Sequence, residues 1–261
     1  MESSEDRNAA DVVKIISLDS VDSTNLELAR LMSTSLVQPW TVIVAQEQTA
    51  GRGRQGRTWS SDHGAGMWAS VLVELVDCPT PTWLPLITGM AVARATRELT
   101  GSDIGVKWPN DVMADGRKLA GILVESVPGT HQYIVGIGLN FTSSIYPGAV
   151  GLRELGPAGK TLGRDLVVNE VTHQLFNAVR AWGAGSWRTE QLERDYTSVC
   201  LSIGVELAIT EPGEATWAGV GCGIDSEGHL LVREHNSEML RTLIAADVVH
   251  ATIAPCTQKN S

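Results

Sequence analysis

The stretch Gln48-Thr-Ala-Gly-Arg-Gly-Arg-Gln-Gly-Arg57 places three glycines and three arginines within ten residues. An apolar, β-branched run at 41–45 precedes it and predicts a strand. Residues 59–62, which follow it, show no signal for the start of a helix. The glycines permit unusual backbone conformations and a close approach to a ligand. Arginine carries a permanent, planar charge that suits phosphate or carboxylate. In a chain of net charge −10, this loop therefore indicates an anion site.

Two other interpretations of the loop compete with an anion site. The segment 51–56 matches G-x-G-x-x-G, the fingerprint of dinucleotide-binding proteins, but that fingerprint needs a helix directly behind it. The other interpretation is a solvated basic loop without a ligand, although such loops are usually lysine-rich and not glycine-spaced. The glycine spacing and the absence of a helix signal favour the anion site.

Composition narrows the class of protein. At 261 residues the chain can form one large domain, or a large and a small one. Hydrophobic residues make up 43% and charged residues 19%, which is typical of a soluble globular protein. The acidic balance argues against a general nucleic-acid binder, because such proteins present a basic face.

The cysteines and the N-terminus indicate the compartment. The four cysteines are far apart, form no C-x-x-C, and have no histidine partner at metal-ligand spacing. This pattern is typical of a reduced, intracellular protein without a zinc site. The first residues are polar and acidic and not a signal peptide, and no apolar run reaches the length of a membrane span. We expect a cytoplasmic protein with no membrane partner.

Hydrophobic patterning predicts the elements of the first two hundred residues. A helix is expected after a capping box of Thr24 and Glu27, another over 83–100 with a stop at Gly101, and a third over 165–199 in two pieces. Strands are expected at 12–18, 41–45, 66–76, 117–125 and 132–140. Mixed helices and strands of this kind indicate an α/β or α+β core.

The character of the chain changes after residue 201. Short strands separated by turn clusters suggest a small β-barrel or sandwich, and they are expected at 205–210, 216–222, 230–233 and 240–244. We expect the domain limits to be a disordered tail at 1–11, a large domain at 12–200, a small all-β domain at 201–252, and a tail at 253–261. No flexible linker separates the two domains, so they are expected to touch.

Four polar or glycine-rich clusters fall at the ends of predicted elements, where sites are usually assembled. They are Ser23–Asn25, Gln48–Arg57, Lys107–Asp111 with Lys118, and Gly136–Asn140. Ser23, Thr24 and Asn25 could simply cap their helix, but three hydrogen-bonding side chains exceed what one cap requires. Pro109 forbids a regular central strand in the third cluster, which is expected to be a turn that presents polar side chains.

The clusters contain no histidine, which disfavours nucleophilic catalysis through a Ser-His-Asp or Cys-His arrangement. They do gather cationic side chains, namely Arg52, Arg54, Arg57, Lys107 and Lys118. Such a site works by positioning and electrostatic stabilisation, and phosphoryl or nucleotidyl transfer is the reaction that needs this chemistry.

Five motifs, in this order, resemble those of biotin protein ligases over residues 15 to 250. They are Asp22-Ser-Thr-Asn25, Gly51-Arg-Gly-Arg-Gln-Gly-Arg57, Lys107-Trp-Pro-Asn-Asp111, Arg117-Lys-Leu-Ala-Gly-Ile-Leu-Val-Glu125 and Gly136-Ile-Gly-Leu-Asn140. The resemblance implies an α+β fold, in which a mixed sheet with flanking helices, like that of class II aminoacyl-tRNA synthetases, is joined to a small C-terminal SH3-like β-barrel. It also implies a biotin–[acetyl-CoA-carboxylase] ligase.

In that reaction, the carboxylate of biotin attacks the α-phosphate of ATP and gives biotinyl-5′-AMP and pyrophosphate, with Mg²⁺ on the phosphates. A lysine of the biotin carboxyl carrier domain of acetyl-CoA or acyl-CoA carboxylase then attacks the anhydride and releases AMP. No nucleic-acid partner is implied, and the state expected is a monomer or weak homodimer. Only 22 residues precede Ser23, too few for the N-terminal helix-turn-helix of some members.

The resemblance implies a role for individual residues. The catalytic residues would be Lys118, Arg52 and Asp111. Biotin would be bound by Ser23, Thr24, Asn25, Gln48, Gly51, Arg52, Gly53, Arg54, Lys118, Gly121 and Gly136. ATP and the adenylate would be bound by Arg54, Arg57, Trp59, Lys107, Asn110, Lys118 and Asn140. Asp111 would hold Mg²⁺ or orient the incoming amine.

Finer roles follow from the same resemblance. Ser23, Thr24 and Gln48 would bind the polar ureido end of biotin, and Asn25 would support that wall. Trp59 would be the shelf for adenine. Two rival functions stay open at this point. A lipoate or octanoate ligase shares the fold and the adenylate chemistry but needs no partner for a ureido ring, and a non-catalytic, biotin-sensing DNA binder would need a basic surface.

Overall fold

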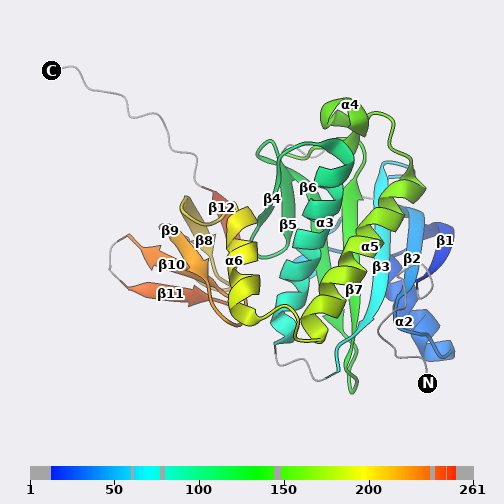
Figure 1. Ribbon diagram of the computed structural model, residues 1–261, viewed down its shortest axis with the longest axis horizontal. Coiled ribbons are helices and arrows are strands. Elements are labelled where there is room, and N and C mark those ends of the chain that lie inside the picture. The colour runs from blue at the N-terminus through cyan, green and yellow to red at the C-terminus, as the bar shows by residue number, and fades with distance from the viewer. Residues whose placement is uncertain are drawn as a thin grey trace.

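The computed structural model describes residues 13–59, 62–76, 80–143, 148–235, 239–244 and 246–250. The predicted tails at 1–11 and 253–261 lie outside these residues. A large mixed sheet at one end of the molecule carries most of the helices, and a smaller sheet lies beside it (Figure 1). None of the helices in the described ranges has the length and hydropathy needed to cross a membrane.

The large sheet has seven strands in the order β1-β2-β3-β7-β6-β5-β4. β1 and β2 pair in parallel, and every other neighbouring pair is antiparallel. The strands are β1 (Lys14–Val21), β2 (Thr41–Gln48), β3 (Gly66–Glu74), β4 (Ile104–Lys107), β5 (Asp111–Ala114), β6 (Arg117–Ser126) and β7 (Gln132–Asn140). The five strands predicted for this sheet are confirmed, with boundaries shifted by one to three residues where they differ. β4 and β5 were not predicted, and the expected turn is limited to the residues between them.

Helices cover both faces of this sheet. α3 (Leu84–Thr100) and α5 (Arg164–Gly183) lie together over one face (Figure 1), and their apolar side chains join those of the strands in one large core. α2 (Thr24–Thr34) covers the other face, where Leu28 packs on Ile43 and Leu72. The two faces receive alternate residues of each strand, because side chains along a strand point to opposite sides. The helices complete the predicted α+β core.

The start of α2 corrects one expectation. Ser23 is the N-cap residue and its side chain makes no capping hydrogen bond, so the capping box of Thr24 and Glu27 is wrong. Thr24 is instead the first helical residue, and both its N–H and its hydroxyl donate to Gln48 Oε1, at 2.9 and 3.1 Å. Glu27 pairs with Arg30 on the outside of the helix. The polar side chains here point toward the sheet and not toward the helix end.

The other predicted helices end close to the positions expected from the sequence. α3 ends at Gly101, which has φ +70° and donates its N–H to Arg97 O, as a C-terminal glycine stop requires. The predicted helix pair at 165–199 is confirmed as α5 and α6 (Thr189–Val199). The short elements are the 3₁₀ turns η1 (Arg54–Gly56), η2 (Pro81–Trp83) and η3 (Leu152–Glu154), and α4 (Gly156–Gly159).

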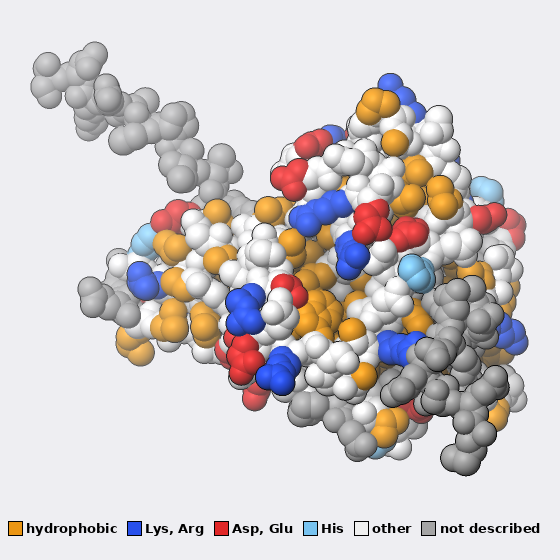
Figure 2. Space-filling model, viewed as in Figure 1, with side chains coloured by type: hydrophobic (Ala, Val, Ile, Leu, Met, Phe, Trp, Pro, Cys, Tyr) orange, Lys and Arg blue, Asp and Glu red, His pale blue; other side chains and the backbone are white. Residues whose placement is uncertain are grey.

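The C-terminal strands form a separate antiparallel sheet of five strands in the order β11-β10-β9-β8-β12. They are β8 (Glu206–Thr210), β9 (Trp217–Ile224), β10 (Leu230–Glu234), β11 (Leu240–Leu243) and β12 (Asp247–His250). The segment that leads into this sheet is bonded to the large one, since Leu201 N–H donates to Val106 O at 2.8 Å. On the face that Figure 2 shows, basic and acidic side chains lie next to one another and form no continuous basic band.

Candidate active site

The predicted clusters meet at one cavity of about 490 Å³ between the ends of β2, β5, β6 and β7. Sixteen of the seventeen predicted site residues line it, namely Ser23, Thr24, Asn25, Gln48, Arg52, Gly53, Arg54, Arg57, Trp59, Lys107, Asn110, Asp111, Lys118, Gly121, Gly136 and Asn140. The seventeenth, Gly51, is buried behind the loop, where its carbonyl accepts a hydrogen bond from Trp59 N–H at 2.9 Å. The cavity floor is apolar between the polar groups and includes Leu123 and Ile137.

The glycine-arginine loop lies over this cavity as a compact turn. An isolated bridge joins Arg52 to Thr58, and Gly53 N–H donates to Arg57 O at 2.7 Å. Gln55 and Gly56 have φ of +56° and +72°. Gly56 adopts this left-handed region without a steric penalty, whereas few residues with a side chain, such as Gln55, do so. In the described part of the chain the next element after the loop is the strand β3, so the helix that the dinucleotide fingerprint needs is not found there. The turn directs arginines to different parts of the cavity.

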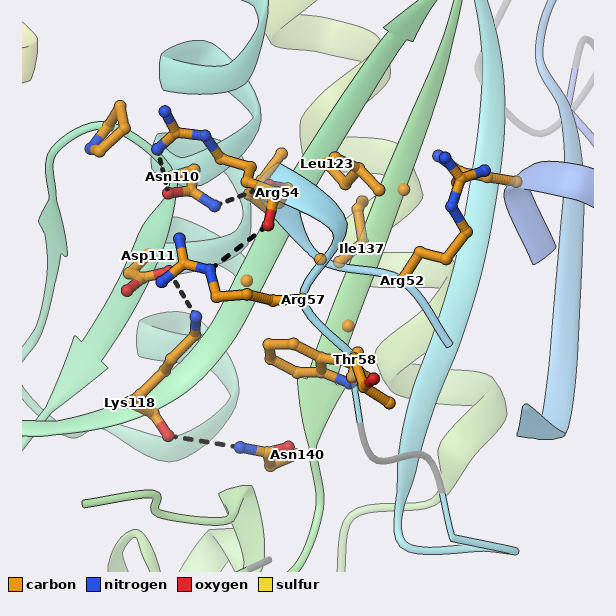
Figure 3. A pocket seen from close by; sticks show the side chains of 18 of the residues that line it. Arg52, Arg54, Arg57, Thr58, Asn110, Asp111, Lys118, Leu123, Ile137 and Asn140 are labelled. Carbon is orange, nitrogen blue, oxygen red and sulfur yellow. Dashed lines mark hydrogen bonds and ion pairs between the residues drawn. The ribbon is translucent and has the colours of Figure 1, made fainter. Parts of the chain in front are cut away.

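Arg54 and Arg57 lie over Asn110 and Asp111, whereas Arg52 points to the opposite side (Figure 3). Arg54 Nη1 donates to Asn110 Oδ1 at 3.1 Å, and this bond joins the loop to the turn between β4 and β5. Arg52 Nη2 lies 3.2 Å from Glu125 Oε1. The loop is therefore held to the cavity walls at two separate points by side chains that also carry charge for a ligand.

One wall of the cavity is a connected set of polar side chains at the start of α2. The hydroxyl of Ser70 lies 2.7 Å from Thr24 Oγ1 and 2.5 Å from Asn25 Oδ1. Asn25 Nδ2 in turn donates to Glu125 Oε2 at 2.7 Å. Thr24, Asn25 and Ser70 are buried, so their orientations are fixed by these bonds. The wall presents preoriented donors and acceptors to a polar ligand group.

Asp22, which precedes the polar wall in the sequence, is also held in place by hydrogen bonds. Asp22 accepts a hydrogen bond from Ser23 N–H at 2.7 Å, and its carboxylate binds the guanidinium of Arg30 at 2.6 Å. The hydrogen bond from Arg30 lowers the pKa of Asp22 to about 2. Asp22 is thus an anion outside the cavity that holds the entry of α2, and it does not line the cavity itself.

On the opposite side, Lys118 reaches into the cavity from β6. Its ammonium lies 2.6 Å from Asp111 Oδ1 and 4.9 Å from the ring centre of Trp59. The backbone of Lys118 is also anchored, because its carbonyl accepts from Asn140 Nδ2 at 3.3 Å and from Val150 N–H at 2.9 Å. A cation held this firmly can stabilise developing negative charge without first reorganising.

Glycines make the slot between the walls narrow and backbone-lined. A Cβ at Gly138 would lie 2.7 Å from Trp59 Cε2, and one at Gly121 would lie 2.8 Å from Trp59 Cζ3. A Cβ at Gly136 would lie 2.5 Å from Asn25 Oδ1. The predicted close approach at these strand glycines is therefore present, and at two of them the approaching group is Trp59.

The acidic groups limit how a metal could be bound. Among the described residues, no three His, Cys, Asp or Glu side chains are gathered as a metal site. Mg²⁺ is commonly held by one or two carboxylates together with substrate phosphates, and Asp111 at the cavity wall fits that pattern. The carboxylate is shared with Lys118, so a metal there would lie beside a cation.

Several residues that line the cavity or support its walls from behind were not predicted as site residues. Ser70 is a lone polar residue in an apolar strand, which is the signal that could have found it. Glu125 stands at the end of a quoted motif but was given no role. Val248 comes from the C-terminal sheet and Ala246 from the segment directly before β12, and no local pattern could have placed them here. Residues 148 and 149 reach the cavity through an isolated bridge of Ala149 to Lys118.

Comparisons with known proteins agree with this geometry. The model of the biotin/lipoate A/B protein ligase family matches residues 17–141. A biotin–[acetyl-CoA-carboxylase] ligase of Mycobacterium tuberculosis is 34% identical, over 87% of this chain and 85% of that protein. One from Paracoccus denitrificans is 31% identical, over 83% and 92%. The structure of an Aquifex aeolicus biotin protein ligase in complex with biotin and ATP matches with a TM-score of 0.77 and 28% identity, over 91% and 99% of the two chains.

Proposed function

The chain belongs to the biotin/lipoate A/B protein ligase family, and we propose that it is a biotin–[acetyl-CoA-carboxylase] ligase. The observation that carries the proposal is the meeting of a polar wall, an apolar slot and a set of cations in one cavity. A polar wall suits a ureido ring, an apolar slot suits an aliphatic acid, and the cations suit a carboxylate and a triphosphate.

The first step joins two anions. The carboxylate oxygen of biotin attacks the α-phosphorus of ATP, and the bond to the leaving pyrophosphate breaks, so that biotinyl-5′-AMP forms. Arg52, Arg54 and Lys118 reduce the repulsion between the two reactants and stabilise the charge that spreads over the α-phosphate. Mg²⁺ neutralises the phosphate charge when bound, with Asp111 as its protein ligand or as a guide for the incoming amine.

The wall and the slot orient biotin for this attack. Ser23, Thr24 and Gln48 bind the ureido group, and Asn25 supports them from behind through its bond with Ser70. The backbone at Gly121 and Gly136 borders the slot. Holding the carboxylate at a fixed distance and angle supplies much of the acceleration that such a reaction needs.

The nucleotide side of the cavity has its own set of proposed ligands. Trp59 supplies a flat surface for adenine, and Arg57, Lys107, Asn110 and Asn140 supply polar contacts to the rest of the adenylate. In the second step, the amine of a lysine on a biotin carboxyl carrier domain attacks the acyl carbon of the anhydride. The amide forms, AMP leaves, and the amine gives up one proton.

We further infer the organisation of the chain. Residues 12–200 form the unit that binds biotin and ATP, and 201–252 form an SH3-like unit in the cytoplasmic enzyme. The strand order of the small sheet supports this, because a meander of four strands is followed by a fifth strand that returns beside the first. The two units act together, since the cavity is also lined by Ala246 and Val248 of the C-terminal unit.

A lipoate or octanoate protein ligase is the second candidate, because the matching family also contains lipoate ligases. It would use the same cations and slot, but it would have no ligand group for the buried polar set of Thr24, Asn25 and Ser70. A non-catalytic biotin sensor would have no use for the ion pair of Lys118 and Asp111.

Pyrophosphate release tests these alternatives. The purified chain with ATP and Mg²⁺ is expected to release pyrophosphate with biotin and not with lipoate or octanoate. Transfer is then measured on a purified carrier domain, with its Lys→Ala variant as the matched control, which should remain unlabelled. Turnover with lipoate alone would overturn the assignment, and biotin binding without pyrophosphate release would favour the sensor.

A further inference from the structure

The turn between β9 and β10 is fastened to the large unit by three side-chain donors. The three successive carbonyls at 226–228 accept hydrogen bonds from Trp83 Nε1 at 2.9 Å, Thr82 Oγ1 at 2.6 Å and Trp108 Nε1 at 3.0 Å. Trp83 and Trp108 are almost completely buried. The contact is therefore a specific joint between the two units and not a loose surface contact.

The turn itself is internally fixed. The Asp225 carboxylate accepts hydrogen bonds from the backbone N–H groups of Glu227 and His229, both at 2.9 Å, and its other oxygen lies 3.1 Å from His229 Nδ1. Gly228 has φ +83° and its N–H donates to Asp225 O at 3.0 Å. A turn with so many internal bonds can act as a rigid reference for the groups that bind it.

Of the three donors, Trp108 also belongs to the reaction cavity. It lines the cavity together with Pro109, Asn110 and Asp111, which follow it directly in the chain. Its backbone N–H donates to Ser202 Oγ at 3.2 Å. The backbone and the side chain of Trp108 are thus both bonded to residues of the C-terminal part of the chain, whereas the residues that follow it in sequence line the cavity.

The two residues after Pro109 carry charge contacts of the site. Asn110 accepts from Arg54 through Oδ1, and its Nδ2 donates to Ile122 O at 2.9 Å. Asp111 holds the ammonium of Lys118. A displacement of the turn at Trp108 would therefore move the partners of Arg54 and of Lys118 together.

We propose that Trp108 is a positioning residue for adenylate formation, through which the β9–β10 turn of the C-terminal sheet sets the places of Asn110 and Asp111. This inference rests on the proposed ligase function for its catalytic readout. The indole touches no reacting atom in this role. It acts because a misplacement of about 1 Å in a catalytic group can cost about 10²-fold in rate.

The competing explanation is that Trp108 only fastens the two units. Trp83 provides a matched control, because it is a buried tryptophan whose indole binds another carbonyl of the same turn, that of Ser226. Trp83 does not line the cavity. Trp83→Phe and Trp108→Phe each remove one indole hydrogen bond to the β9–β10 turn. Only Trp108→Phe removes a bond made by the β4–β5 turn, which carries Asn110.

The test compares the full-length protein with these two variants. We expect Trp108→Phe to lower kcat for biotin-dependent pyrophosphate release about 10- to 100-fold, while KM for biotin changes far less. Trp83→Phe should keep the wild-type kcat although its melting temperature falls. Equal kcat in both variants, or kcat losses that follow the losses in melting temperature, would overturn the proposal.

Two further measurements cover other outcomes. If Trp108→Phe does not fold, Asp225→Ala and Asp225→Asn replace it, because Asn keeps the Oδ1 acceptor of the turn and Ala does not. The Ala variant should then lose kcat and the Asn variant should keep most of it, and equal activity would count against the joint. Amide exchange of residues 110–114 should become faster in Trp108→Phe and not in Trp83→Phe. This measurement does not depend on activity. If the wild-type protein shows no biotin-dependent turnover, the ligase assignment fails, but the positioning role of Trp108 is still tested.

Discussion

The ammonium of Lys118 lies 2.6 Å from the carboxylate of Asp111, across the paired strands β5 and β6. The two residues are not directly opposite, since Lys118 pairs with Met113 and Asp111 pairs with Gly121. A register shift between Val112 and Met113 lies between them. The carboxylate thus fixes the position of the lysine before any ligand binds, which is the preorganisation that electrostatic catalysis requires.

Lys118→Ala tests the central charge of the site. We expect biotin-dependent pyrophosphate release to slow by about 10²–10³-fold, or about 3–4 kcal/mol, because the cation stabilises the charge of the transition state. Biotin affinity, measured by calorimetry, should change much less. Lys160→Ala is the control, since Lys160 is exposed and outside the cavity. An unchanged rate in Lys118→Ala would contradict the proposed chemistry.

Asp111→Asn tests whether Asp111 acts as a ligand of Mg²⁺ or as the charged partner of Lys118. We expect kcat for adenylate formation to fall about tenfold, or about 1.4 kcal/mol, because Lys118 loses its charged partner. The Mg²⁺ concentration that gives half-maximal activity should stay the same, since Asp111 is engaged by Lys118. A magnesium titration of both proteins measures this. A clear rise in the Mg²⁺ requirement would instead make Asp111 a metal ligand.

Local sequence predicts the parts of this site that lie within one element. The strand before the loop, the stop at Gly101 and the thin backbone at Gly136 each depend on a few neighbouring residues, and all are present in the structure. The capping box failed because Thr24 bonds to Gln48, which lies 24 residues further along the chain. A local signal for a helix start cannot reveal that the same hydroxyl bonds to a residue on a distant strand.

Long-range pairs set the limit of prediction. Asn25 bonds to Glu125 across a separation of 100 residues, and Trp108 bonds to Gly228 across 120. Neither pair has a spacing or pattern that one sequence displays, because each depends on how segments distant in the chain pack together. The resemblance to a family supplied the roles of the cavity residues, whereas the structure supplied the residues behind them, such as Ser70.

Ser70→Ala tests the support behind the polar wall. Its hydroxyl is fully buried and donates to Asn25 Oδ1 at 2.5 Å, so its loss leaves that buried oxygen without this donor, whereas Thr24 keeps its bond to Gln48. We expect biotin to bind about 5- to 100-fold more weakly, which corresponds to about 1–3 kcal/mol. Calorimetry measures the affinity, and Ser198→Ala on the exposed side of α6 is the control. Wild-type affinity in Ser70→Ala would show that the wall orients without it.

Gly138→Ala tests whether the slot needs bare backbone. The new Cβ would lie 2.7 Å from the ring of Trp59, too close for the tryptophan to keep its place. We expect the affinity for ATP and biotin to fall, because overpacking, which typically costs about 1–3 kcal/mol of stability, displaces Trp59 from the cavity. Gly223→Ala in β9 is the control, because its Cβ would meet nothing within 4 Å. Equal binding in the two variants would mean that Trp59 yields freely.

Hydrogen exchange of the glycine-arginine loop tests its response to the ligand. The loop amides at 53, 57 and 59 donate to carbonyls of the loop itself, and Arg52 is partly exposed, so local opening should be easy in the empty protein. Ordering three arginines and three glycines costs conformational entropy, and the negative charge of the ligand compensates that cost.

Exchange at residues 51–59 should therefore slow when biotin is added, and slow further with the adenylate, while the turn at 211–214 serves as an internal reference far from the cavity. Arg52→Ala should reduce the protection, because the loop then loses a charge that faces the ligand and its link to Glu125. Exchange rates that are the same with and without biotin would mean that the loop is already ordered, and that the arginines act as fixed charges and not as a closing cover.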